Sequence, residues 1–197
     1  MSALVVAGDV SGTCTLQAPS AAGSTVLTLP VIAADTLAGI AATQTLTNKT
    51  LGAGTVFPAG AVLQVVSATT STAVSSSSSA YADSGLTATI TPTSATSKIL
   101  VLFNQNIFKS SGNAGNNINI KIFRGATDLG VFANSQLYNN TAQEAYGSCG
   151  ASYLDSPATT SATTYKTQFS NGNNTALVRC QPDSNGKSTI TLMEIAG

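Results

Sequence analysis

The chain contains no histidine and no tryptophan, and only 8% of its 197 residues are charged. The absence of histidine excludes the Ser-His-Asp and Cys-His systems of nucleophilic catalysis. It also removes a nitrogen ligand that many zinc sites use. Because a typical globular domain has roughly 25% charged residues, the supply of acids and bases for catalysis is small. These absences weaken most enzymatic interpretations before any motif is considered.

The charges that are present are balanced and dispersed. Eight basic and eight acidic residues cancel, which argues against disorder caused by charge repulsion. The lysines and arginines occur singly along the chain, whereas a face that binds nucleic acid needs them clustered. No stretch approaches the roughly 18–20 apolar residues of a membrane helix. We therefore expect no nucleic acid as a partner and no insertion into a membrane.

Cysteine is also scarce, and the motifs of common cofactor sites are missing. Cys14, Cys149 and Cys180 are widely spaced, and no Cys-x-x-C pair occurs. We expect small buried thiols, and a Cys149–Cys180 disulfide remains the alternative. No P-loop and no dinucleotide-binding glycine motif is present. Residues 183–186 resemble the opening of a calcium loop but lack its later acidic ligands, so we predict a β-turn there, with no metal and no cofactor.

Hydroxyl groups dominate instead, since serine and threonine make up 52 residues. They alternate with apolar residues in short runs, and this period of two predicts β-strands. The clearest run puts Ile118, Ile120 and Ile122 on one face, opposite Asn117, Asn119 and Lys121. Further strand-like runs lie at 62–66, 86–90, 98–103, 165–169, 176–180 and 188–195. Turn residues separate them at 124–128, 171–174 and 183–186.

Residues 57–197 therefore predict about eight strands and no long helix. The continuous apolar run 98–103 predicts a central strand buried on both faces. The final run, 188–195, is expected to be locked into a sheet. The fold class we predict is all-β, with this region forming a jelly-roll-like antiparallel β-sandwich.

The first 56 residues differ from the rest of the chain. They contain one basic residue, Lys49, and no aromatic residue. Short alternating runs at 13–16 and 24–29 predict strands, and the alanine-rich residues 32–42 are compatible with one short helix. Because the segment lacks bulky side chains for a core of its own, we expect it to pack against other copies or a host particle. We predict a domain boundary at Pro58, between residues 1–56 and residues 57–197.

The polar segment 134–146 is the candidate binding loop. Its amides and phenols can hydrogen-bond sugar hydroxyls without charge, and long loops on sandwich scaffolds often bind ligands. An exposed loop without function and a contact between subunits are the alternatives. The candidate residues are Gln136, Tyr138, Asn139, Asn140, Gln143 and Tyr146.

One pair of acids offers an enzymatic alternative. Glu144 and Asp155, flanked by tyrosines, are the best candidates for the two carboxylates that cleave a glycosidic bond. Surface acids beside packing aromatics are the plainer interpretation. No catalytic residue is predicted.

Two sets of segments carry a resemblance to a known family. Residues 11–30 and 34–51 resemble the N-terminal segments of bacteriophage tail-fibre proteins. Residues 90–99, 153–165 and 188–195 are similar to the distal domain attached to such fibres. The resemblance implies a homotrimeric virion surface protein, with residues 1–56 as a β-rich trimerising and anchoring stem and residues 57–197 as a jelly-roll-like head, and it implies no catalytic residues.

The stem of 56 residues is short compared with the repetitive shafts of fibres. A short stem favours a head fibre or capsid decoration protein, and a receptor-binding tail fibre is the alternative. A cellular carbohydrate-binding or surface-layer module is a third possibility. The expected partners are two further copies of the chain, other virion proteins contacted through residues 1–56, and a host surface glycan. The expected location is the virion surface, after assembly in the host cytoplasm.

Overall fold

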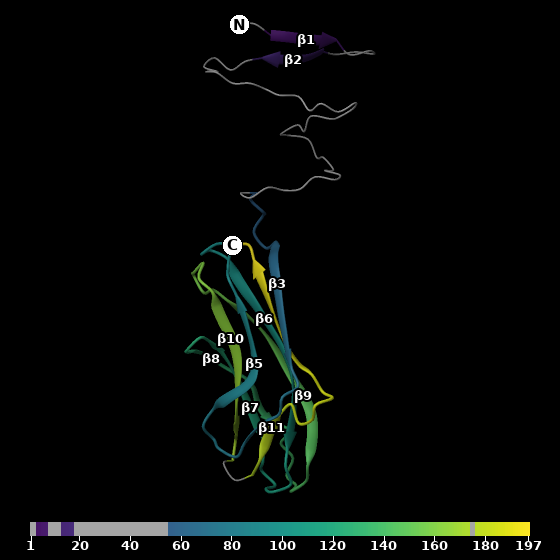
Figure 1. The fold of residues 1–197 in the computed structure, drawn as a ribbon, viewed down its shortest axis with the longest axis vertical. Coiled ribbons are helices and arrows are strands. Elements are labelled where there is room, and N and C mark those ends of the chain that lie inside the picture. Colours follow the sequence, from purple (N-terminus) through teal and green to yellow (C-terminus); the bar gives the residue numbers. More distant parts are fainter. Residues whose placement is uncertain (1–2, 8–12, 18–54, 174–175) are drawn as a thin grey trace. The chain divides into compact units, whose positions relative to one another are not determined.

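The computed structural model describes residues 3–7, 13–17, 55–173 and 176–197, and the chain forms two units, Met1–Gly52 and Ala53–Gly197. In the first unit, β1 (Ala3–Ala7) and β2 (Thr13–Gln17) pair antiparallel (Figure 1). The strand predicted at 13–16 is therefore confirmed. The strand predicted at 24–29 and the short helix at 32–42 lie outside the described residues.

The second unit contains ten strands, and its described residues include no helix. They are β3 (Val62–Thr70), β4 (Val74–Ser76), β5 (Ala82–Ile90), β6 (Lys98–Lys109), β7 (Ile118–Arg124), β8 (Thr127–Gln136), β9 (Ala145–Asp155), β10 (Thr163–Asn171), β11 (Val178–Cys180) and β12 (Ser188–Ile195). The predicted all-β class is confirmed. None of the described residues belongs to a helix that could span a membrane.

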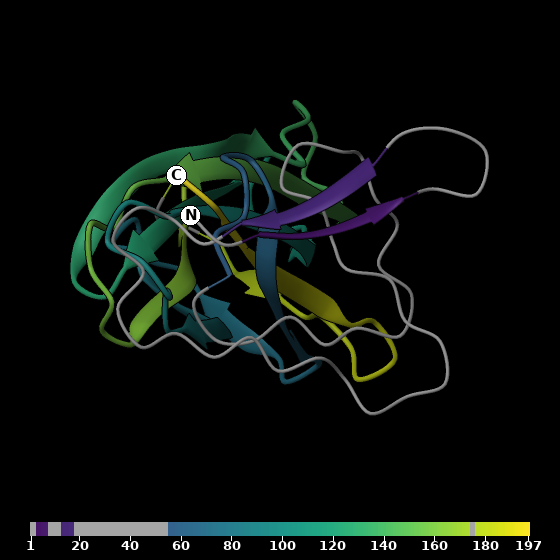
Figure 2. The ribbon, with the colours of Figure 1, turned by 90° about the horizontal axis from the view of Figure 1, so that it is seen from above.

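Every strand pair is antiparallel, and the strands of the second unit form two sheets. One has the order β5-β10-β7-β8; the other has the order β3-β12-β6-β11-β4, with β9 also paired to β6. β12 lies between β3 and β6, so the prediction that the last strand is locked into a sheet is confirmed. β3 (blue) and β12 (yellow) run side by side in Figure 1 and in the end-on view of Figure 2.

The inward faces of both sheets supply one hydrophobic core, an arrangement consistent with a β-sandwich. Ile118, Ile120 and Ile122 of β7 are fully buried, as their alternation predicts. The core also contains residues of β5, β6, β9, β10, β11 and β12. Each sheet therefore buries one face, and its opposite face remains outside.

Two details of the predicted pattern were wrong. Along β6, Ile99 and Val101 are buried but Leu100 and Leu102 are only half-buried, because an antiparallel sheet packs a core on one face. Asn117, predicted to face outward, is buried; it precedes β7, and its Nδ2 donates to the Gly115 carbonyl at 2.9 Å.

Four strands were missed in the sequence: β1 in the first unit, and β4, β8 and β9 in the second. β4 has only three residues. β8 contains Gly130, and β9 contains Gly147 and Gly150, which interrupt the alternation of apolar residues. The predicted turn at 124–128 is a two-residue hairpin between β7 and β8. Its first turn residue, Gly125, has φ +56°, a conformation that glycine adopts without steric cost.

Candidate functional site

The candidate loop, residues 137–144, joins β8 to β9. It is shorter than the predicted segment 134–146, because the first three residues of that segment complete β8 and the last two begin β9. Its sequence is polar, with a single large apolar residue, Leu137, which packs against the core. The loop therefore has one anchored end and a polar remainder that faces outward.

β6 fixes where this loop lies in the second unit. The last residue of β6, Lys109, pairs with Ala145 at the start of β9, and the first, Lys98, pairs with Ile195 near the C-terminus. The eleven steps between them, at about 3.3 Å each, span roughly 36 Å. The chain enters the unit near the C-terminus, since the Gly60 amide donates to the Ala196 carbonyl at 2.8 Å. The loop and the incoming chain are thus at opposite ends of the head.

A buried lysine holds the loop in place. Lys109 is fully buried, and its ammonium donates to the Asn139 side-chain oxygen and, at 3.2 Å, to the Thr141 carbonyl. The Thr141 hydroxyl also donates to the same Asn139 oxygen, at 3.0 Å. A buried ammonium group requires such acceptors, so losing them would be costly. The loop is therefore positioned by the interior of the head.

The backbone at the start of the loop is strained. Ser135 and Leu137 have φ values of 52° and 60°, a left-handed conformation that costs about 1–3 kcal/mol for residues other than glycine. Between them the chain turns, and the Tyr138 amide donates to the Ser135 carbonyl at 3.3 Å. Such strain persists where surrounding contacts enforce it and is common at binding sites.

Four of the six predicted site residues point to solvent. Tyr138 is 57% exposed and Tyr146 is 65% exposed, and Asn140 and Gln143 are exposed as well. The other two are occupied within the structure. Asn139 accepts the bond from Lys109 described above, and the Gln136 Nε2 donates to the Asn134 carbonyl at 2.9 Å.

An aromatic contact next to the loop was not predicted. The ring of Tyr146 lies 4.7 Å from that of Phe108, centroid to centroid. The Arg179 guanidinium carbon is 5.7 Å from the centroid of the same Phe108 ring, and its Nε donates to the Ser75 hydroxyl at 3.0 Å. These residues come from β4, β6, β9 and β11, so only the sheet order brings them together. The phenols and amides of the loop, the exposed carboxylate of Glu144 and the partly exposed guanidinium of Arg179 therefore lie at this end of the head.

The proposed acid pair is separated. Glu144 precedes β9 and Asp155 is its last residue, so about eleven residue steps, or roughly 36 Å, lie between them. Glycosidase carboxylates stand only about 5–9.5 Å apart. The two acids therefore cannot act on one glycosidic bond within a single head.

Asp155 instead links the two sheets. Its oxygens accept hydrogen bonds from Arg124 Nη1 at 2.7 and 2.8 Å and from the Tyr165 hydroxyl at 2.6 Å. Burial, together with the bond to Asp155, raises the pKa of Tyr165. Burial alone would lower the pKa of Arg124, but its bond to Asp155 raises it. Asp155 lies in β9 of one sheet and its partners lie in β7 and β10 of the other, so this ion pair joins the sheets.

The remaining sequence candidates that the structure describes form no metal or redox site. The Asp183 carboxylate accepts the amides of Asn185 and Gly186 at 2.9 and 2.8 Å, as in the predicted turn. No cluster of three acidic or cysteine side chains suited to a metal occurs in the described part of the chain. Cys149 and Cys180 are buried free thiols. Burial raises the pKa of Cys149 to about 12 and raises that of Cys180 as well, so both thiols are unreactive at neutral pH.

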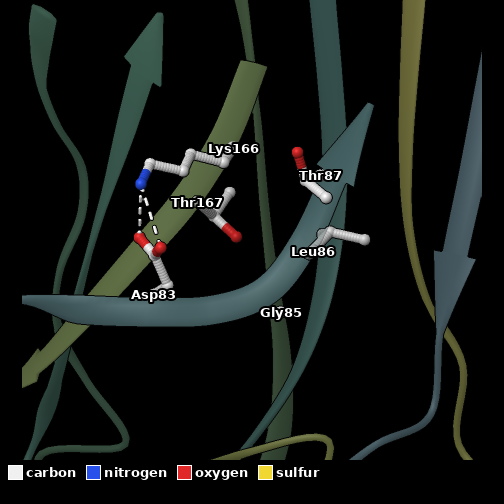
Figure 3. Close-up of a pocket in the computed structure, with 6 residues that line it drawn as sticks. All are labelled: Asp83, Gly85, Leu86, Thr87, Lys166 and Thr167. Carbon is white, nitrogen blue, oxygen red and sulfur yellow. Dashed lines mark hydrogen bonds and ion pairs between the residues drawn. The ribbon is translucent and has the colours of Figure 1, made fainter. Parts of the chain in front are cut away.

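A pocket of about 160 Å³ lies on the outer face of the four-stranded sheet (Figure 3). It forms where the β5–β10 register shifts near Gly85, which has φ +80°. Its charged residues neutralise each other, since the Lys166 ammonium is 2.8 Å from Asp83 Oδ1. The Thr167 hydroxyl bonds to Ser84 Oγ at 2.6 Å and to Gln105 Oε1 at 2.9 Å. Because these polar groups already have partners within the protein, the loop is the stronger candidate site.

Comparison of the chain with known protein-family models and with curated proteins found no match. The function is therefore argued from the arrangement of the head and its loop.

Proposed function

We propose that the chain is a noncatalytic virion surface protein. Residues 1–56 join three copies and anchor them to the particle, and residues 57–197 form the exposed head. The observation that carries this proposal is the separation of the two ends of the head. The chain enters beside the exposed apolar residues Val56 and Phe57, and the amide- and tyrosine-rich loop lies roughly 36 Å away. A head tethered at the first end presents the loop outward.

The head belongs, in this proposal, to the jelly-roll architecture. With β4 and β11 set aside, the remaining eight strands pair first with last: β3 with β12, β5 with β10, β6 with β9, and β7 with β8. This is the pairing of one long antiparallel ribbon folded over on itself. The resulting orders, β3-β12-β6-β9 and β5-β10-β7-β8, support a two-sheet jelly roll of eight strands. Viral capsid and lectin domains use this architecture, although the architecture alone does not specify a function.

The loop supports adhesion to a neutral, hydroxyl-rich ligand such as a surface glycan. Tyr138, Asn140, Gln143 and Tyr146 offer donors, acceptors and aromatic rings without a formal charge. Three heads on one stem present three such loops, so weak contacts gain in total affinity through multivalency. The separated positions of Glu144 and Asp155 count against the alternative of a glycan depolymerase.

Removal of residues 1–50 tests the proposed stem. The full chain is expected to have the mass of a trimer by multi-angle light scattering, and the truncated chain the mass of a monomer, or to be insoluble. An intact trimer after the truncation would reject the role of the stem. A monomeric full chain would reject the proposal as a whole.

Capsid decoration and receptor binding are distinguished by where the protein lies on the particle. Immunogold label over the capsid, with capsids that become fragile when the protein is missing, would identify a decoration protein. Label at the tail, with loss of adsorption to host cells, would identify a receptor-binding fibre.

A further inference from the structure

A row of four apolar side chains crosses the outer face of the six-stranded sheet. Met193 of β12 pairs with Val65 of β3 on one side and with Leu100 of β6 on the other, and Leu100 pairs with Leu154 of β9. Strand alternation turns these side chains away from the core, since their chain neighbours Leu192, Ile99 and Val101 are the ones that are buried. We call Val65, Met193, Leu100 and Leu154 the apolar row.

The two ends of the apolar row are exposed, its central residues Met193 and Leu100 are half-buried, and it continues toward the point where the chain enters the head. Val65 is 55% and Leu154 is 48% exposed. Beyond them, Val62 is 53% exposed and pairs with Ile195. Eight large hydrophobic side chains are exposed in the described part of the chain, and five of them lie at this end: Val56, Phe57, Val62, Val65 and Leu154. Such a concentration, unlike scattered single residues, marks a contact surface.

On the side toward the loop, the surroundings of the apolar row are mostly polar and carry no charge. The next row along the same strands contains Ser67, Thr191, Leu102 and Ser152. An apolar centre with few charges and a polar margin is the composition of a protein–protein interface. The charged residue nearest to the apolar row on this face is Lys98, at the start of β6, which pairs with Ile195.

The outer face of the other sheet has the opposite character. Its exposed surface carries two ion pairs, Lys166 with Asp83 and Lys121 with Asp128. The Lys121 ammonium also lies 4.4 Å from the centroid of the Tyr81 ring. One exposed apolar residue, Val131, pairs with Lys121 there. The two outer faces of the head therefore differ in chemistry, and only the six-stranded one suits burial.

We propose that the apolar row packs against the heads of the other copies in the assembly. The inference rests on the proposed trimer and names the surface by which its heads meet. The occupant follows from where the chain enters: a stem that joins the copies brings the same end of every head together, and the apolar row lies at that end. The apolar row itself contains no charged residue, so packing it against other copies buries no like charges; the exposed Lys98 lies at its margin. The shared stem supplies the high effective concentration that a contact of this small size needs.

Cross-linking of the full chain tests the proposal. Met193→Cys, at the centre of the apolar row, is placed in a Cys14→Ser background and treated with a short bis-maleimide. Cys149 and Cys180 do not compete, because burial suppresses their reactivity. Leu154→Cys provides a second position that tolerates substitution, since its side chain is half exposed. Val131→Cys, an exposed valine on the other sheet, is the matched control.

Chains linked to one another are expected from Met193→Cys and Leu154→Cys and not from Val131→Cys. A monofunctional maleimide is expected to label both positions at least about tenfold more slowly than the control, because an interface core excludes solvent. Rapid labelling at both positions would overturn the inference. Slow labelling without links between chains would also overturn it, because the chain's own N-terminal residues would then cover the face. Light scattering distinguishes failure of this inference from failure of the proposed function. A chain that has the mass of a trimer but forms no cross-links refutes only the contact through the apolar row, whereas a chain that has the mass of a monomer also refutes the proposed trimer.

Discussion

At the scale of single residues, several of the few charged side chains are buried and connect separate strands through hydrogen bonds. Glu194 is fully buried and accepts hydrogen bonds from Gln64 Nε2 at 2.6 Å and from the Thr93 amide and hydroxyl at 2.7 Å each. Burial by itself raises the pKa of Glu194. The hydrogen bonds from Gln64 and Thr93 outweigh burial and hold the pKa below its ordinary value. The ionised carboxylate thus ties the turn before β6 to β3 and β12.

Replacement of this carboxylate should alter stability in a pH-dependent way. Because the pKa of Glu194 is lowered on folding, its contribution is present above the unfolded pKa of 4.5 and is lost as the pH falls through the folded value. In Glu194→Gln the new side-chain NH₂ group would lie against the hydrogen-bond donors of Gln64 and Thr93, which then lose an acceptor. We therefore expect a loss of about 1–3 kcal/mol in the free energy of unfolding at pH 7. We also expect a shallower decline in acid. Urea denaturation between about pH 7 and pH 3 measures both effects.

Glu144→Gln is the matched control for this prediction, since Glu144 is exposed. Its unfolding curve should follow that of the native chain within about 0.5 kcal/mol. Equal effects of the two substitutions would show that burial and hydrogen bonding at Glu194 contribute nothing.

At the scale of elements, strands follow from local pattern and the loop does not. The alternation at 117–122 and 188–195 predicts β7 and β12 because side chains on a strand point alternately to opposite faces. The loop's conformation depends on Lys109, which is 30 residues from Asn139. No local pattern in the loop indicates that a lysine at the end of another strand holds it.

Lys109→Met should release the loop while leaving the sheets intact. Methionine fills a similar volume but donates no hydrogen bond, so Asn139 and the Thr141 carbonyl lose a partner. Amide hydrogen exchange, followed by mass spectrometry, is expected to become faster in residues 137–144 and to stay unchanged in β6 and β12. Lys98→Met, at the exposed first residue of the same strand, is the control and should change neither. Unchanged exchange in the loop of Lys109→Met would mean that the loop is held by other contacts.

At the scale of the whole molecule, neutrality extends from the composition to the surface proposed for contact. Eight basic and eight acidic residues cancel over the chain, and the exposed ion pairs lie on the face away from the apolar row. An assembly held by apolar and hydroxyl-rich surfaces has few charge–charge contacts for salt to screen.

The proposed trimer should therefore withstand salt. Sedimentation velocity on the full chain is expected to give the same trimer mass from about 0.05 M to about 1 M NaCl, since screening weakens charged contacts and not apolar burial. Dissociation at high salt would indicate an interface built on ion pairs, contrary to the surface proposed here.

The strand content and the all-β class could be predicted because the alternation of apolar and polar residues is visible in consecutive positions of the sequence. The lack of histidine likewise excludes its chemistry without any structure. β8 and β9 were not predicted, because glycines interrupt their alternating pattern. The predicted loop was too long because its two ends belong to these strands.

Only the tertiary structure decided which distant residues are neighbours. The apolar row exists because register aligns Val65, Leu100, Leu154 and Met193, which lie in four different strands. The same register puts the incoming chain and the loop at opposite ends of the head. The physical reason is that periodicity determines which face a side chain takes, whereas strand order and register determine what lies beside it.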